Sequence, residues 1–459
     1  MMADLAALLP EGLAVAVEKA CGARITGVRP RGGGGASRDG AELDLAWPDG
    51  RTASAYMNHD VHKAGAGDDA AFLREAAVLR ALSGPLASAG VRVAPYFASI
   101  PEQRALVCGL VKGEDRFGNL ADAQQRSALA RDFMAQLAAL HRIDVAKAPV
   151  EGMGRVEPAE ALIRRRIATV RETNSGKAWD PLIHLSLDWL EANIPDDMPP
   201  PVIVHGDAGP GNFLFEGDRV TALLDWELVH YGDPMADLAM LCLRMLFQGF
   251  VPLPEAFAAY EAAGGYPVDL KRLRFWRLLF QTGFARRSRY DDPDAPPPPN
   301  LGMNLVYSTI HRRVLSEALA DAADVALPQV ALPEALPGAH DHSYSIALDD
   351  IRNTIVPRLT DQQAAVKAKG MARLIKWWRA IERFGPGFQA AEKSELETTL
   401  NQEFADHAAA WSAFCECVAG GSIAIDRAII LCNAHETREA ALMADAMGGL
   451  AATTFAALE

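Results

Sequence analysis

The stretch that decides the fold is His205-Gly206-Asp207-Ala208-Gly209-Pro210-Gly211-Asn212, followed after one short hairpin by Asp225-Trp226-Glu227. A short apolar run at 202–204 precedes it and predicts a buried strand that leads into a polar loop. Phosphoryl transfer requires a carboxylate near the attacking hydroxyl and oxygen ligands that hold Mg²⁺ against the nucleotide phosphates. Asp207 and Asn212 at D-x-x-x-x-N spacing, with Asp225 ending the next hairpin, supply these groups.

Each polar residue of this segment has an expected role. We expect Asp207 to orient and deprotonate the acceptor hydroxyl, and Asn212 and Asp225 to bind Mg²⁺. For His205 we expect a bracing role through packing and hydrogen bonding, with a direct catalytic or metal-binding role as the alternative. Asp237, in the first turn of the next helix, is either an ordinary helix-start carboxylate or a hydrogen-bond acceptor for the backbone of the loop.

Upstream, residues 25–111 have a β-rich pattern with one helix. A run of four glycines at 32–35 separates two apolar stretches, and residues 42–47 alternate in polarity as a half-buried strand does. Asp49-Gly50 predicts a turn that closes a hairpin onto residues 52–57. The run 71–82 has helical periodicity. The pattern predicts a small sheet with one helix laid over it.

Downstream of residue 112 the pattern is mainly helical. Residues 128–142 repeat apolar side chains at helical spacing, and Asp233-Pro234 suits a helix start. A proline-rich stretch at 326–338 is typical of a linker. Beyond it, residues 343–459 predict a helical bundle, in which Leu374, Trp377, Trp378, Ile381 and Phe384 form one stripe.

The run HGDAGPGNFLFEGDRVTALLDWELVHYGDPMADLAML resembles the aminoglycoside phosphotransferase-like kinases, a family related to choline kinases. It is most similar to the branch that resembles the N-terminal kinase-like region of certain acyl-CoA dehydrogenases. The glycine-rich turn and the runs FLREAAVLRAL, LVCGLVKGED, LHRID and LDWLEANIP follow in family order. The resemblance covers residues 12–320.

The resemblance implies an α+β, two-lobed protein-kinase-like fold. The N-lobe would be residues 1–111 and the helical C-lobe 112–325, followed by a linker at 326–342 and an additional all-α domain at 343–459. ATP would lie between the lobes, with the adenine against a hinge at 107–111. The residues expected to contact the nucleotide are Gly33, Gly34, Gly35, Ser37, Glu75, Cys108 and Leu110.

One position departs from the family pattern. Kinases of this class place a lysine, or in some branches an arginine, at the end of the strand after the Asp49-Gly50 turn, where it pairs with the glutamate that Glu75 matches. This chain has Ala55-Tyr56-Met57-Asn58 there. Three outcomes follow: Lys63 returns to the site, Arg38 contacts phosphate instead, or nucleotide binding is weak.

Composition limits the partners. The net charge of −14 and the pI of 5.3 argue against nucleic acid. No apolar run reaches the roughly 18 residues of a membrane-spanning helix, and the N-terminus lacks the basic start of an export signal. We therefore expect a cytoplasmic protein without a membrane partner. The six cysteines are scattered, which favours unpaired thiols over a zinc site.

Two functions remain open from the sequence. The first is an ATP- and Mg²⁺-dependent kinase that phosphorylates a hydroxyl of a small molecule, such as a hydroxylated acyl thioester or an aminoglycoside. The alternative is a catalytically silent, nucleotide-binding or scaffold protein that acts through its C-terminal helices. In either case the C-terminal domain is a candidate surface for a homodimer or a partner enzyme.

Overall fold

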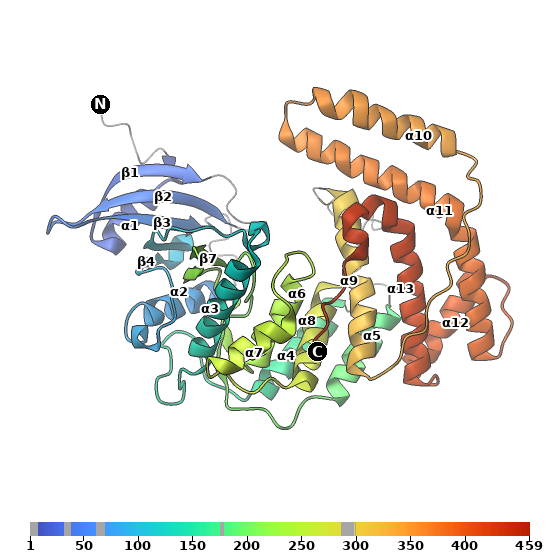
Figure 1. The fold of residues 1–459 in the computed structure, drawn as a ribbon, viewed down its shortest axis with the longest axis horizontal. Coiled ribbons are helices and arrows are strands. Elements are labelled where there is room, and N and C mark those ends of the chain that lie inside the picture. Colours follow the sequence, from blue (N-terminus) through green and yellow to red (C-terminus); the bar gives the residue numbers. More distant parts are fainter. Residues whose placement is uncertain (1–7, 32–37, 61–68, 175–178, 286–297, 299) are drawn as a thin grey trace. The chain divides into compact units, whose positions relative to one another are not determined.

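The computed structural model of the chain describes residues 8–31, 38–60, 69–174, 179–285, 298 and 300–459 (Figure 1). These form two compact units. The first contains residues 1–162, 196–273 and 456–459, and the second contains residues 163–195 and 274–455. A search of the described helices finds none that is long and apolar enough to span a bilayer.

The first unit opens with a five-stranded antiparallel sheet in the order β1-β2-β3-β5-β4. Its strands are β1 (Arg24–Arg31), β2 (Asp39–Ala46), β3 (Thr52–His59), β4 (Tyr96–Ile100) and β5 (Ala105–Gly109). The predicted hairpin is confirmed, and Gly50 closes it with φ 86°. Helix α1 (Leu13–Cys21) buries Leu13 and Val17 in one core cluster with Leu43 and Met57 of the sheet.

Helix α2 (Ala70–Leu82) confirms the predicted helix beside this sheet and contacts β4. It buries apolar side chains such as Phe72 and Val78, but also the carboxylate of Glu75, which is only 3% exposed. A charged group is rarely buried without a partner. The buried charge of Glu75 therefore requires a compensating partner nearby.

Short strands and helices form the rest of the first unit. They are α3 (Ala123–His141), β6 (Val202–Val204), β7 (Phe213–Glu216), β8 (Arg219–Leu223), β9 (His230–Gly232), α6 (Met235–Arg244) and α7 (Leu253–Ala262). Strand β6 pairs with β9, and β7 pairs with β8. The rings of Phe117, Phe133 and Phe213 pack together beneath the β7–β8 hairpin. Because Phe213 directly follows Asn212, this packing holds the C-terminal end of the predicted catalytic loop.

Helices α4 (Ala159–Asn174) and α8 (Leu270–Phe284) each run from one unit into the other. The remaining helices of the second unit are α5 (Pro181–Ala192), α9 (Leu301–Ala322), α10 (Asp341–Asp349), α11 (Gln362–Leu400), α12 (His407–Ala419) and α13 (Ile425–Met447). Helix α13 packs against α9 and α11, and α12 packs against α11 and α5. Helices α5 and α9 fall within the predicted C-lobe but are compact with the C-terminal helices. The domain boundaries at 111, 325 and 342 stay predictions.

The apolar stripe expected on α11 divides between two environments. Leu374, Trp377 and Phe384 pack against the core clusters shared with neighbouring helices. Trp378 and Ile381 instead remain 47% and 37% exposed. Because adjacent residues differ by about 100° around a helix, Trp377 and Trp378 cannot share one face fully. The single stripe predicted from the sequence therefore contains both packed and exposed side chains.

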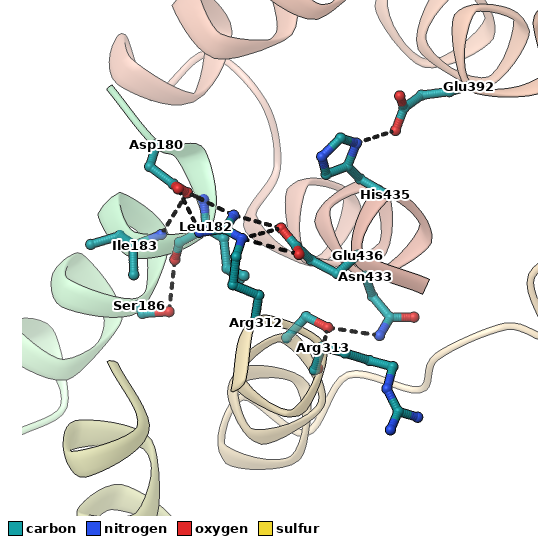
Figure 2. Close-up of polar contacts among 11 residues, drawn as sticks. Asp180, Leu182, Ile183, Ser186, Arg312, Arg313, Glu392, Asn433, His435 and Glu436 are labelled. Carbon is teal, nitrogen blue, oxygen red and sulfur yellow. Dashed lines mark hydrogen bonds and ion pairs between the residues drawn. The ribbon is translucent and has the colours of Figure 1, made fainter. Parts of the chain in front are cut away.

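A buried ion cluster joins three helices of the second unit (Figure 2). Arg312 of α9 donates to Asp180 before α5 and to Glu436 of α13, with nitrogen-oxygen distances of 2.5–3.3 Å. Asp180 also caps α5 by accepting from the backbone N–H of Leu182. Although burial opposes it, the two carboxylates raise the pKa of Arg312. The cluster thus fixes the register of α5, α9 and α13.

Candidate active site

The predicted catalytic loop is held by a buried carboxylate from the next helix. Asp237 of α6 accepts the backbone N–H groups of His205 and Gly206, both at 2.8 Å. The same carboxylate lies 3.0 Å from Nε2 of His141, whose Nδ1 lies 2.7 Å from the hydroxyl of Tyr260. Burial opposes ionisation, but these hydrogen bonds keep the pKa of Asp237 below its usual value. Of the two interpretations of Asp237, the loop-binding one is confirmed.

His205 is fully engaged inside the loop. Its Nε2 lies 2.8 Å from the carbonyl oxygen of Leu224, and its Nδ1 lies 3.3 Å from the backbone nitrogen of Asp207. The ring packs against Trp226, with 4.4 Å between the ring centroids. Burial lowers the pKa of His205, so the neutral ring can donate from Nε2 and accept at Nδ1. This geometry favours the expected bracing role.

Asp207 and Asn212 lie together and share an arginine that sequence reasoning missed. The Asn212 amide donates to Asp207 Oδ2 at 2.7 Å, and Arg244 Nη1 donates to the same oxygen at 2.7 Å. Arg244 also donates to Asn212 Oδ1 at 3.2 Å and to the carbonyl oxygen of Pro210 at 2.9 Å. It follows Asp237 by seven residues, which is two helical turns. That spacing puts both side chains on the loop-facing side of α6. It was the signal in the sequence from which Arg244 could have been found.

Asp225 follows β8 in a left-handed backbone conformation, with φ 61°. Its neighbour Leu224 donates a backbone hydrogen bond to the carbonyl of Asn212 at 2.9 Å, which ties the two loops together. Partial burial, together with the carboxylates of Glu227 and Asp207, raises the pKa of Asp225 to about 6. The structure therefore gathers an excess of negative charge beside Asn212.

The donor set suits a hard divalent cation. Asn212 Oδ1 and the Asp225 carboxylate are oxygen ligands of the kind that Mg²⁺ binds, and Mg²⁺ completes its shell with waters and substrate phosphates. A carbonyl oxygen has two lone pairs, so Asn212 can accept from Arg244 and still face a cation. Among the described residues no group of three or more His, Cys, Asp or Glu side chains could hold a metal ion. A site for Mg²⁺ with nucleotide needs no such group.

Glu75 pairs with a residue just before β2 rather than with one on β3. Arg38, directly before β2, donates to Glu75 at 2.6 Å and lies 3.4 Å from a carboxylate oxygen of Glu227. Burial raises the pKa of Glu75, while Arg38 opposes that rise. Of the three outcomes expected for the missing strand lysine, the structure supplies an arginine at the glutamate. Lys63 lies outside the described residues.

The other residues expected at the nucleotide lie in or beside the sheet. Cys108 is buried in β5, where burial raises the pKa of its thiol to about 12. Leu110 follows β5, is 37% exposed, and donates its N–H to Ser54 at 2.9 Å. Gly33, Gly34, Gly35 and Ser37 lie outside the described residues. All six cysteines fall in the described part of the chain, and no disulfide joins any two of them.

Residues 61–276 match the phosphotransferase enzyme family. The predicted resemblance to phosphotransferases is confirmed over this region. The phosphotransferase region contains α2 with Glu75, the loop with Asp207 and Asn212, and α6 with Arg244. It therefore includes every site side chain described above except Arg38.

Relatives with curated descriptions match about a third of this chain. Acyl-CoA dehydrogenase family member 11 of Pongo abelii is 30% identical over 147 residues, which are 31% of this chain and 18% of that protein. Acyl-CoA dehydrogenase family member 10 of Mus musculus is 28% identical over 141 residues, which are 30% of this chain and 13% of that protein. The matched segments thus span less than a fifth of these relatives.

The two-lobed kinase-like fold is confirmed by a solved structure. A protein of Ralstonia eutropha JMP134, assigned to the aminoglycoside phosphotransferases, is 21% identical, with a TM-score of 0.50. The match covers 65% of this chain and 92% of that protein. At this level of identity the likeness establishes the fold alone.

Proposed function

We propose that the chain is an ATP- and Mg²⁺-dependent kinase that transfers the γ-phosphate of ATP to a hydroxyl of a small molecule. The observation that carries the proposal is the cluster of Asp207, Asn212 and Asp225 on two loops tied by one backbone hydrogen bond. The match of residues 61–276 to the phosphotransferase enzyme family supports this reaction class.

In this reaction Asp207 acts on the acceptor. Its carboxylate takes the hydroxyl proton while the acceptor oxygen forms a bond to the γ-phosphorus. The bond from the γ-phosphorus to the bridging oxygen breaks, and ADP leaves with the electron pair. Arg244 and Asn212 hold Asp207 at 2.7 Å each, so the carboxylate is oriented before the acceptor binds.

Asn212 and Asp225 would hold Mg²⁺, which neutralises charge on the phosphate oxygens during transfer. Burial raises the pKa of Asp225, and so do the nearby carboxylates of Glu227 and Asp207, which repel its negative charge. A bound cation offsets that repulsion. Arg38, which links Glu75 to Glu227, is the basic group among the described residues beside the sheet that we propose for contact with the nucleotide phosphates.

The Arg38–Glu75 pair supports an active kinase over a silent scaffold. The scaffold hypothesis depended on the absence of a strand lysine, and Arg38, directly before β2, supplies a cation to the same glutamate. For the acceptor we propose a hydroxylated acyl thioester, because curated relatives of the phosphotransferase region are named as acyl-CoA dehydrogenases. An aminoglycoside is the second acceptor to test.

Calorimetry of ATP binding with and without Mg²⁺ tests the nucleotide site. Asp225→Ala should abolish Mg²⁺-dependent binding, because it removes a metal ligand in the ground state. Asp218→Ala is the matched control, since Asp218 is an exposed carboxylate on the same β7–β8 hairpin. If wild-type protein fails to bind Mg·ATP, or if both variants bind equally, the proposed site is wrong.

Release of ADP in the presence of hydroxylated acyl thioesters tests the transfer itself. Asp207→Ala should lower turnover by roughly 10²–10⁴-fold and leave the affinity for ATP nearly unchanged. A variant that loses ATP affinity but keeps its rate would contradict the role of Asp207 as the base.

A further inference from the structure

The hydrogen bonds to Asp207 leave one of its carboxylate oxygens open. Asn212 and Arg244 both donate to Oδ2, each at 2.7 Å. No residue in the described part of the chain donates to Oδ1. An acceptor hydroxyl must come within hydrogen-bond reach of the base that takes its proton. Oδ1 is therefore the oxygen open to the acceptor, and side chains that border this loop are candidates for recognising the rest of the acceptor.

A glutamine borders the same loop one turn beyond Arg244. The backbone N–H of Gln248 donates to the carbonyl oxygen of Arg244 at 3.0 Å, which extends the helical geometry of α6 by one turn. Residues four apart on a helix lie on the same side of it. The side chain of Gln248 therefore lies beside that of Arg244 at the catalytic loop.

Gly211, directly before Asn212, makes room for both side chains. Its φ is 89°, in the left-handed region. A Cβ at this position would lie 2.7 Å from Oε1 of Gln248 and 3.0 Å from Nη2 of Arg244. The same Nη2 donates to Oδ1 of Asn212 at 3.2 Å. The amide of Gln248 is thus adjacent to the guanidinium that holds the base.

The amide of Gln248 has hydrogen-bonding capacity that the protein itself does not use. The side chain is exposed, and within the part of the chain that the structure describes its amide forms no hydrogen bond. A carboxamide presents both N–H donors and a carbonyl acceptor. Small-molecule sites use a few such polar groups to fix the orientation of a ligand.

The side chains that reach the loop from the second half of α6 and the turn after it include no acid. Leu241 and Arg244 lie within 3.4 Å of the Cβ position of Gly209, and Gln248 lies at that of Gly211. An ammonium group beside the acceptor hydroxyl would meet a guanidinium here, whereas a carbonyl oxygen can accept from the Gln248 amide. The arrangement favours an acceptor with a carbonyl near its hydroxyl over a polyamine.

We propose that Gln248 is a specificity-determining residue whose amide donates a hydrogen bond to a carbonyl oxygen of the acceptor, close to the hydroxyl that Asp207 deprotonates. The inference rests on the proposed kinase function and narrows its substrate class. It selects a hydroxylated acyl thioester, which carries such a carbonyl, over an aminoglycoside, which carries ammonium groups.

Steady-state kinetics with matched acceptors tests the proposal. The first acceptor is the best substrate from a series of hydroxyacyl thioesters that differ in the position of the hydroxyl. The second is its thioether analogue, in which a methylene replaces the carbonyl. Gln248→Leu should raise KM for the thioester by roughly three- to tenfold with kcat nearly unchanged, because it removes a hydrogen bond made equally in the ground and transition states. KM for the thioether and for ATP should not change.

Two further variants separate recognition from structure. Gln124→Leu is the matched control, since Gln124 is an exposed glutamine in the first turn of α3, and it should behave as wild type with both acceptors. Gln248→Glu should lower the ratio of kcat/KM for the thioester to kcat/KM for kanamycin, because a carboxylate cannot donate to a carbonyl and attracts an ammonium group. Circular dichroism confirms that each variant is folded.

Calorimetry distinguishes failure of this inference from failure of the kinase function. Thioester binding is measured without nucleotide, so the role of Gln248 is tested even if ADP is never released, and weaker binding by Gln248→Leu supports it. Three results would overturn the inference: a wild type that binds no thioester of the series, a Gln248→Leu variant with wild-type affinity and KM, or equal losses for thioester and thioether. A wild type that fails to bind Mg·ATP would instead overturn the kinase function.

Discussion

Replacing Arg312 with methionine should strongly destabilise the second unit. The guanidinium is 8% exposed and binds the carboxylates of Asp180 and Glu436 with all three of its nitrogens. Methionine fills much of the volume but leaves two carboxylates, 11% and 3% exposed, without their cation. Removing one partner of a buried ion cluster costs about 3–5 kcal/mol, because the remaining charge is uncompensated. We expect a loss of that size in the free energy of unfolding.

Arg171 provides a matched control within the same unit. It also bridges two carboxylates, Asp188 and Glu191, at 2.7 Å each, but its side chain is 36% exposed and theirs are about half exposed. Exposed pairs of this kind contribute at most about 1 kcal/mol. Urea unfolding followed by circular dichroism should therefore separate Arg312→Met clearly from Arg171→Met, with a similar denaturant slope for both.

A combined variant tests the cause of the loss. Adding Asp180→Asn and Glu436→Gln to Arg312→Met removes the uncompensated charges and should recover much of the stability. Asparagine at 180 can still cap α5. If Arg312→Met costs no more than Arg171→Met, or if neutralising the carboxylates recovers nothing, the reasoning about uncompensated buried charge is wrong.

Two further predictions concern other charged pairs. Arg38→Ala should weaken Mg·ATP binding by roughly tenfold or more, because it leaves Glu75 unpaired, and Arg38→Lys should lose less, since it keeps a cation there; calorimetry that finds Arg38→Ala equal to wild type would contradict this role. The stability advantage of wild type over Glu392→Gln should be largest between about pH 4.5 and 6.5. Burial favours the neutral form of Glu392, but hydrogen bonds from two histidines lower its pKa from 4.5 to about 2. Burial likewise disfavours the charged form of His435, but the hydrogen bond to Glu392 raises its pKa. The glutamate contribution is lost as the pH falls toward 2, and the histidine contribution is lost as the pH rises through the raised pKa. The difference in the free energy of unfolding between wild type and Glu392→Gln should be at most about 3 kcal/mol. Unfolding curves in which this difference does not change with pH would refute the prediction.

Local patterns were sufficient for much of the fold. The hairpin at Asp49-Gly50, helix α2 and the buried strand before His205 all follow from spacing and turn residues. The loop-binding role of Asp237 was one of two open interpretations, because helix-start carboxylates are common and only the contact to the backbone of His205 distinguishes them. Sequence reasoning succeeded where the interacting groups lie within a few turns of one another.

The partners of charged groups needed the tertiary structure. Glu75 is paired with Arg38, 37 residues away, although the family pattern places its partner on β3. Arg244 was missed because its seven-residue spacing from Asp237 was its only local signal, and a surface arginine can have the same spacing. On α11 the sequence suggested one apolar stripe, but neighbouring helices cover Trp377 and leave Trp378 exposed.

From the sequence alone, short-range spacing was sufficient to predict the polar groups of the catalytic segment and their order, and the resemblance to a known family implied the two-lobed fold. Only the tertiary structure decided which cation neutralises Glu75, which arginine orients Asp207 and which face of α11 is open. A guanidinium can reach any carboxylate that folding brings within a few ångströms, whatever their separation in sequence. Pairing of this kind is a property of the packed chain, and no local pattern specifies it.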